Sequence, residues 1–162
     1  DFGATAAAFT GDDSADFTVE FEPSATALEK QGAGYVVASL GVDSGYVPYT
    51  SYSAKTSYME KNPDIMQKFT DALQKGMDFV QSHTPEEIAE IIEPQFPETD
   101  LDTITAIVKR YYDQDTWKSN LIFEKESFEL LEDILEDAGE LKERVPYENL
   151  VTTEYAAKAA EK

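Results

Sequence analysis

Up to residue 59, the apolar residues either alternate with polar ones or form short continuous runs. In "ADFTVEFEP", Phe17, Val19 and Phe21 alternate with polar residues before the run ends at Glu22 and Pro23. Alternation with a period of two is typical of a β-strand that is buried on one face. The continuous run "YVVASL" is typical of a strand that is covered on both faces. The pattern predicts a short sheet with strands near 16–22, 35–40 and 49–59.

After residue 61 the apolar spacing becomes helical. Asn62 and Pro63 are typical of the start of a helix, and apolar residues then recur on one helical face as far as Val80. Thr84 and Glu87 have the spacing of a capping box, in which the two residues satisfy each other's backbone N–H groups. Further amphipathic helices are predicted over residues 100–111, 127–139 and 154–162.

Strand and helix signals that alternate, followed by helices alone, predict an α/β scaffold with a helical layer late in the chain. A length of 162 residues suits one ordinary domain or parts of two small ones. The first ten residues, "DFGATAAAFT", resemble the tail of a helix that stops at Gly11. We therefore expect the chain to begin inside a larger protein.

Charge is the strongest feature of the composition. The chain has 33 acidic and 13 basic residues, and its formal net charge is −20. We expect no nucleic-acid partner, because binding to phosphates requires clustered lysine and arginine. There is no cysteine, which excludes disulfides, thiolate zinc sites and thiol nucleophiles and fits an exported protein as well as a cytosolic one. No apolar run approaches the roughly 18 residues of a membrane-spanning helix.

The residues that carry catalysis and metal binding are sparse. The single histidine, His83, stands at the end of a predicted helix, and no cysteine or second histidine is present to build a triad. Glu20 and Glu22 are the best carboxylate pair, because positions i and i+2 share one face of a strand about 6.6 Å apart. Nothing else supports a hydrolase. We expect no catalytic residue, no cofactor and no metal site.

Several motifs occur in a specific order along the chain: Asp16 with Glu22-Pro23, then "YVVASL", "SGYVPYT", "SYSAKTSYM" and Asn62-Pro63-Asp64. The tail "EDAGELKERVPYENLVTTEYA" follows them. This order resembles the second half of the substrate-binding proteins of ABC importers, of the nitrate/sulfonate/taurine and thiamine-precursor type. The resemblance covers essentially the whole chain.

The resemblance implies a periplasmic-binding-protein type II-like fold, with a ligand bound between two α/β lobes. Residues 1–40 would form the end of the distal lobe and the hinge crossover, and residues 41–162 the C-terminal half of the other lobe. The protein would be extracytoplasmic, lipid-anchored through an N-terminal region outside this sequence, and would deliver a small molecule to ABC permease subunits.

The resemblance also places Glu22 at the cleft, where its carboxylate would accept a hydrogen bond from a ligand N–H group. The other predicted ligand contacts are Phe21 and Tyr46, through their ring faces, and Ser44, Gly45 and Thr50, through backbone or hydroxyl groups. A second interpretation of Glu22, compatible with the first, is that it caps the helix that begins near Pro23.

The charge pattern around the predicted cleft bears on the ligand. From Asp1 to Ala54 the chain has no arginine and one lysine, Lys30. A sulfonate or nitrate receptor needs a cradle rich in cations or N–H groups. The sequence therefore favours a neutral or amine-bearing heterocycle, such as a thiamine precursor.

Two other function classes remain open. The density of amphipathic helices over residues 62–162 fits a helical protein-interaction domain, which predicts large apolar patches on exposed helix faces. A carboxylate-pair hydrolase on Glu20 and Glu22 is the other. In addition, unpaired strand edges predict that the isolated chain is dimeric or strand-swapped.

Overall fold

The computed structural model describes residues 4–162, and every regular element in that range is a helix. The chain divides into two compact units, which consist of residues 4–43 with 83–116 and of residues 44–82 with 117–162. None of the helices in the described part of the chain combines the length and the apolar character that crossing a bilayer requires.

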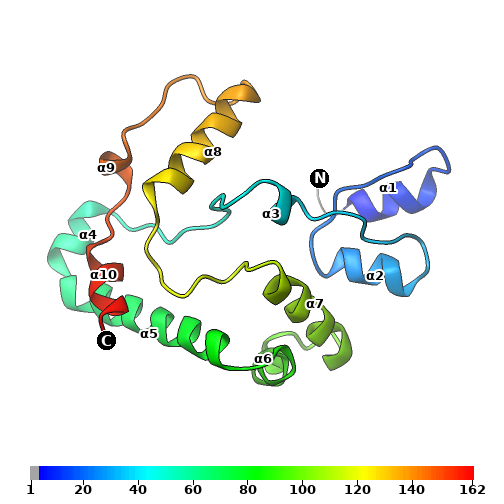
Figure 1. The fold of residues 1–162 in the computed structure, drawn as a ribbon, viewed down its shortest axis with the longest axis horizontal. Coiled ribbons are helices and arrows are strands. Elements are labelled where there is room, and N and C mark those ends of the chain that lie inside the picture. Colours follow the sequence, from blue (N-terminus) through cyan, green and yellow to red (C-terminus); the bar gives the residue numbers. More distant parts are fainter. Residues whose placement is uncertain (1–3) are drawn as a thin grey trace. The chain divides into compact units, whose positions relative to one another are not determined.

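The first unit contains α1 (Thr5–Gly11), α2 (Ser24–Lys30), α3 (Leu40–Asp43), α6 (Pro85–Ile92), the 3₁₀ turn η2 (Glu93–Gln95) and α7 (Leu101–Asp113). Its core forms where α6 packs against α7 (Figure 1). The buried apolar side chains there are Ile88, Ala89, Ile104 and Val108. The helical spacing of these residues in the sequence matches the face that each helix buries.

The predicted capping box of Thr84 and Glu87 is confirmed. The Thr84 side chain accepts a hydrogen bond from the Glu87 N–H, and the Glu87 carboxylate accepts one from the Thr84 N–H at 2.9 Å. Asp100 caps α7 by accepting the Thr103 N–H at 2.9 Å. These bonds satisfy N–H groups that the first turn of a helix leaves without an intrahelical partner.

The second unit contains α4 (Thr56–Lys61), α5 (Pro63–Ser82), α8 (Lys125–Asp137), α9 (Tyr147–Leu150) and α10 (Glu154–Ala160). The long helix α5 packs against α10, which buries Ala156 and Ala159 (Figure 1). The small alanine side chains allow the two helices to approach closely. Gly139 follows α8 with a φ of 75°, a left-handed conformation that glycine adopts without steric cost.

Three glutamines of α5 are spaced seven residues apart and fasten neighbouring segments to the helix. Seven residues are close to two helical turns, so the three side chains share one face. Each donates a hydrogen bond from its Nε2 to a backbone carbonyl: Gln67 to Tyr155 at 3.0 Å, Gln74 to Ser119 at 2.8 Å and Gln81 to Trp117 at 2.8 Å. This row of glutamines ties α10 and the segment before α8 to α5.

The predicted α/β fold with a short sheet is wrong, because residues 4–162 contain no strand and no bridge. The segments near 16–22 and 35–39 form no regular element, and residues 17–20 and 37–38 make no backbone hydrogen bond within the described chain. Alternating apolar and polar residues indicate only that successive side chains point to opposite sides of the backbone. A strand also needs a second backbone to pair with, and the described residues supply none.

In place of the predicted strand at 49–59, residues 49–55 form no regular element and α4 begins at Thr56. Met59, Glu60 and Lys61 are good helix formers, so the end of the segment follows its helix propensity instead of the alternation. The division of the chain at residue 40 into two lobes of a larger receptor stays a prediction.

Candidate functional site

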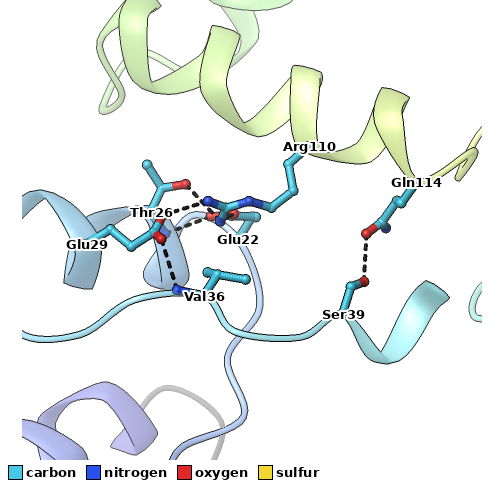
Figure 2. Close-up of polar contacts among 7 residues, drawn as sticks. All are labelled: Glu22, Thr26, Glu29, Val36, Ser39, Arg110 and Gln114. Atoms are coloured by element: carbon cyan, nitrogen blue, oxygen red, sulfur yellow. Dashed lines mark hydrogen bonds and ion pairs between the residues drawn. The ribbon is translucent and has the colours of Figure 1, made fainter. Parts of the chain in front are cut away.

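Glu22 lies in the turn that precedes α2, and its side chain is 5 % exposed. Its Oε2 accepts the backbone N–H of Thr26 at 3.0 Å, in the first turn of α2. Its Oε1 accepts a hydrogen bond from Nη1 of Arg110 on α7 (Figure 2). The carboxylate therefore caps α2 and forms an ion pair with α7.

Arg110 connects three segments of the first unit. Its Nη2 donates to Oε2 of Glu29 at 2.6 Å, while Nη1 reaches Glu22. The other oxygen of Glu29 accepts the Val36 N–H at 2.9 Å (Figure 2). We call Glu22, Thr26, Glu29 and Arg110 the Arg110 cluster. It holds the residues before α2, α2 itself and the segment around Val36 against α7.

The contacts within the Arg110 cluster stabilise the charged forms of Glu29 and Arg110. The Val36 N–H and the Arg110 guanidinium together lower the pKa of Glu29 below its usual value. Burial of Arg110 works against its charge, but the hydrogen bonds and attraction of Glu29 and Glu22 outweigh that effect and raise its pKa. One guanidinium thus serves two carboxylates, which leaves the Arg110 cluster with one excess negative charge.

The Arg110 cluster is part of a polar row along α7. Thr103 accepts a hydrogen bond from the Lys30 ammonium, and Gln114, just beyond the helix, accepts one from the Ser39 hydroxyl at 2.8 Å. Positions 7 and 11 residues apart lie on one helical face. Sequence reasoning missed Arg110. The signal that could have identified it is the row of polar residues 103, 110 and 114 beside the apolar stripe of this helix.

Both oxygens of Glu22 accept hydrogen bonds from the protein itself. That geometry agrees with the capping interpretation, and a contact between Glu22 and a ligand stays a prediction. Glu20, the other carboxylate of the hydrolase hypothesis, accepts a hydrogen bond from the Thr18 hydroxyl at 3.0 Å. The protein's own groups thus engage both carboxylates.

The remaining predicted contacts are divided between the two units. Phe21 belongs to the first unit, and its residue is 42 % exposed. Ser44, Gly45, Tyr46 and Thr50 belong to the second unit and are exposed. A single site built from all of them therefore stays a prediction.

The segment that precedes α4 carries a series of exposed tyrosines. Tyr49 is 81 % exposed, and Tyr52 is 76 % exposed and meets Phe69 edge to face at a ring separation of 5.1 Å. The Lys118 ammonium lies 4.0 Å from the ring centroid of Tyr46, which is cation–π geometry. Gly45, with a φ of 76°, turns the backbone just before Tyr46. These rings offer apolar faces on which a planar ligand would stack.

Within residues 4–162, no three histidine, aspartate or glutamate side chains come together as ligands for an ion.

Comparison with known proteins gives one informative match. The chain is 39 % identical over 158 residues, or 98 % of its length, to a protein of Bacillus subtilis (strain 168) named "Putative binding protein YtlA". It spans 47 % of that relative's length, so the relative is about twice as long as this chain. No protein-family model and no solved structure matches the chain.

Proposed function

We propose that this chain is part of the solute-binding component of an ABC importer, which captures a small molecule outside the cytoplasm and delivers it to a membrane permease. The observation that carries this proposal is the similarity to a protein named as a binding protein along 98 % of the chain. The order of the motifs from Asp16 to Asp64 supports the importer type. Because the relative is about twice as long, the proposal concerns a longer protein of which this chain is one part.

Closure around the ligand is the mechanism of the proposed receptor. Two lobes of the longer protein approach each other about a hinge, and contacts that exist only in the closed form stabilise it. The closed form then docks on the permease. No bond of the solute is made or broken, so the relevant quantities are the affinity and the change in conformation.

The proposed ligand is an amine-bearing heterocycle, such as a thiamine precursor. Tyr46, Tyr49 and Tyr52 supply exposed rings, and the strong negative charge of the chain favours a cation over an anion. Glu22 already forms an ion pair with Arg110. We therefore expect the tyrosine-bearing segment to contribute more to ligand binding than this carboxylate.

Calorimetry on the protein expressed from its complete reading frame tests the proposal. Aminopyrimidines should release heat on binding, and Tyr46→Ala should weaken the affinity roughly tenfold through the lost ring contact. Tyr35→Ala, which removes another exposed tyrosine, is the matched control. Tight binding of an alkanesulfonate would overturn the ligand class, and binding of no small solute would overturn the receptor.

A helical protein-interaction domain is the second candidate function, because every described element is a helix and some large apolar side chains on helices are exposed. Ile65 and Phe69 of α5 are 53 % and 43 % exposed, although their spacing predicts an inward face. A protein partner that crosslinks to α5 in cells, and is lost in Ile65→Ser, would favour this function. A solute-specific heat in calorimetry favours the importer.

Self-association of the isolated chain also stays a proposal. The irregular segments around residues 17 and 36 expose Phe17, Tyr35 and Val37 at 80 %, 84 % and 76 %, and exposed apolar groups in an unpaired backbone favour association. Light scattering that shows a monomer at all concentrations would exclude it.

A further inference from the structure

A pocket of about 250 Å³ lies within the second unit, between α8 and the segment that leads into α9. The side chains that matter for its chemistry are Lys125, Phe128, Glu129, Glu132, Arg144 and Tyr147. Pockets that hold drug-sized ligands are usually larger, about 300–1,000 Å³. This pocket therefore fits a small molecule, and it shares no residue with the tyrosine-bearing segment described above.

Glu132 is the buried polar group of this pocket. The residue is 8 % exposed, and its Oε1 accepts the Val145 N–H at 2.9 Å. Its Oε2 accepts no hydrogen bond from the described residues, and this oxygen is not fully enclosed by the protein. A carboxylate held in this way has one oxygen fixed by the backbone and a second oxygen available to a donor that enters the pocket.

Aromatic rings form the apolar wall. Phe128 is 8 % exposed and meets Tyr147 edge to face at 5.7 Å. Phe123 contacts both rings at 6.1 and 6.4 Å, and its carbonyl accepts the Tyr147 hydroxyl. The hydrogen bond and the three mutual contacts fix the orientation of Tyr147. The wall is therefore preorganised, which reduces the entropy that a ligand would lose on binding.

The basic groups at the pocket already have acidic partners. Lys125 lies 3.3 Å from Glu148 and 3.8 Å from Glu129, and Arg144 lies 2.5 Å from both Asp133 and Glu136. With Glu132, two cations face five carboxylates, so the surroundings carry a clear excess of negative charge. An anionic ligand would meet repulsion and paired cations, whereas a cationic ligand would be attracted.

We propose that this pocket binds a small organic cation, namely a primary ammonium group on a short aromatic or alkyl body. The ammonium donates to Oε2 of Glu132, and its apolar body lies against Phe128 and Tyr147. A hydrogen bond between an ammonium and a carboxylate is charge-assisted and stronger than a neutral one. An aromatic wall also attracts cations. The inference does not depend on the importer function, because the site lies within one unit and needs no permease.

Nuclear magnetic resonance titration of the full chain with benzylammonium chloride is the test. Amide signals of Phe128, Val145 and Tyr147 should shift and saturate, with a Kd of about 1 mM for so small a ligand. Benzyl alcohol and benzoate keep the aromatic ring and replace the ammonium by a neutral hydroxyl and by an anionic carboxylate, respectively. They should shift the same signals at least tenfold less strongly at equal concentration, since the charge-assisted bond is missing.

Glu132→Gln is the decisive variant, because its amide oxygen still accepts the Val145 N–H while the charge is removed. Its Kd for benzylammonium should rise about tenfold. Glu90→Gln on α6 of the first unit is the matched control and should leave the Kd unchanged.

Equal shifts with the three ligands, or an unchanged Kd in Glu132→Gln, would overturn the proposal. So would the lack of any shift up to about 10 mM benzylammonium. If Glu132→Gln fails to fold, the comparison of the three ligands on the unmodified protein still decides.

Discussion

Replacement of Arg110 by methionine tests whether the Arg110 cluster holds the first unit together. Methionine keeps a flexible apolar stem of similar length and removes the guanidinium. Glu22 would keep the Thr26 N–H as its hydrogen-bond donor, but its 5 % exposed carboxylate would lose its only ion pair among the described residues. Glu29 would keep the Val36 N–H.

The structure sets the expected magnitude. Removing one partner of a fully buried ion pair costs about 3–5 kcal/mol. The Arg110 side chain is 29 % exposed and Glu22 keeps one donor, so we expect about 2 kcal/mol from that pair. The pair with Glu29 is about 30 % exposed on each side and adds about 0.5–1 kcal/mol. The total, about 3 kcal/mol, is a large part of a typical unfolding free energy of about 5–15 kcal/mol.

Native-state hydrogen exchange is the most direct assay, because the Thr26 and Val36 amides donate to the cluster itself. A loss of about 3 kcal/mol should speed their exchange roughly a hundredfold where local opening limits it. Lys109→Met is the matched control on the same helix. Lys109 is 60 % exposed and pairs with Asp113 four residues further along the chain, so its removal should change these amides little.

A double-mutant cycle with Glu22→Gln separates the ion pair from the packing. Glutamine still accepts the Thr26 N–H and leaves no buried charge, so Arg110→Met should cost about 1–2 kcal/mol less in that background. If the two substitutions are additive within about 0.5 kcal/mol, or if Arg110→Met leaves both amides protected, then the Arg110 cluster does not stabilise the unit.

Three further predictions concern the caps and the buried glutamine. Hydrogen bonds from the hydroxyl and the N–H of Thr103 are the main causes that lower the pKa of Asp100 from 3.8 to about 2. A carboxyl group whose pKa is lower in the folded than in the unfolded protein stabilises the folded state at pH values above the unfolded pKa. The native protein should therefore lose its advantage in melting temperature over Asp100→Asn as the pH falls from about 4 to 2. Thr84→Ala should cost about 1 kcal/mol in urea unfolding, and Thr84→Ser almost nothing; equal losses would refute the role of the hydroxyl. Gln74→Met should change stability by less than about 1 kcal/mol, because it removes the two hydrogen bonds that Nε2 donates to Ser119 and Asp78 and also the buried Oε1 that has no partner. Gln74→Glu should cost about 2 kcal/mol or more, because a carboxylate can donate to neither Ser119 nor Asp78. Equal costs for the two variants would refute this.

The helices after residue 61 could be predicted from the sequence because their determinants are local. The apolar period, the Thr84–Glu87 capping box and the Asp100 cap each involve residues within one or two turns. The sheet could not be predicted correctly, because strand pairing depends on a second backbone that local alternation does not reveal. Phe17, Val19 and Phe21 alternate as a strand does, yet their segment has no pairing partner in the described chain.

The candidate site shows the same difference between local and distant information. The capping interpretation of Glu22 needs only Thr26, four residues away, and the geometry agrees with it. The ion pair needs Arg110, which is 88 residues away and carries no motif. Likewise, Glu132 follows a helical pattern like its neighbours, and only the fold places it beside Val145 and a pocket.

The row of glutamines on α5 makes the attachment of the neighbouring segments independent of side-chain identity. Gln67, Gln74 and Gln81 all donate to main-chain oxygens, which every amino acid possesses. As far as these bonds are concerned, mutations at 117, 119 and 155 are tolerated. A one-residue insertion in the middle of α5 would instead rotate part of the row by about 100° and detach the segments beyond it. The seven-residue spacing of the glutamines along α5 therefore matters more for this attachment than the side chains of the residues that they contact.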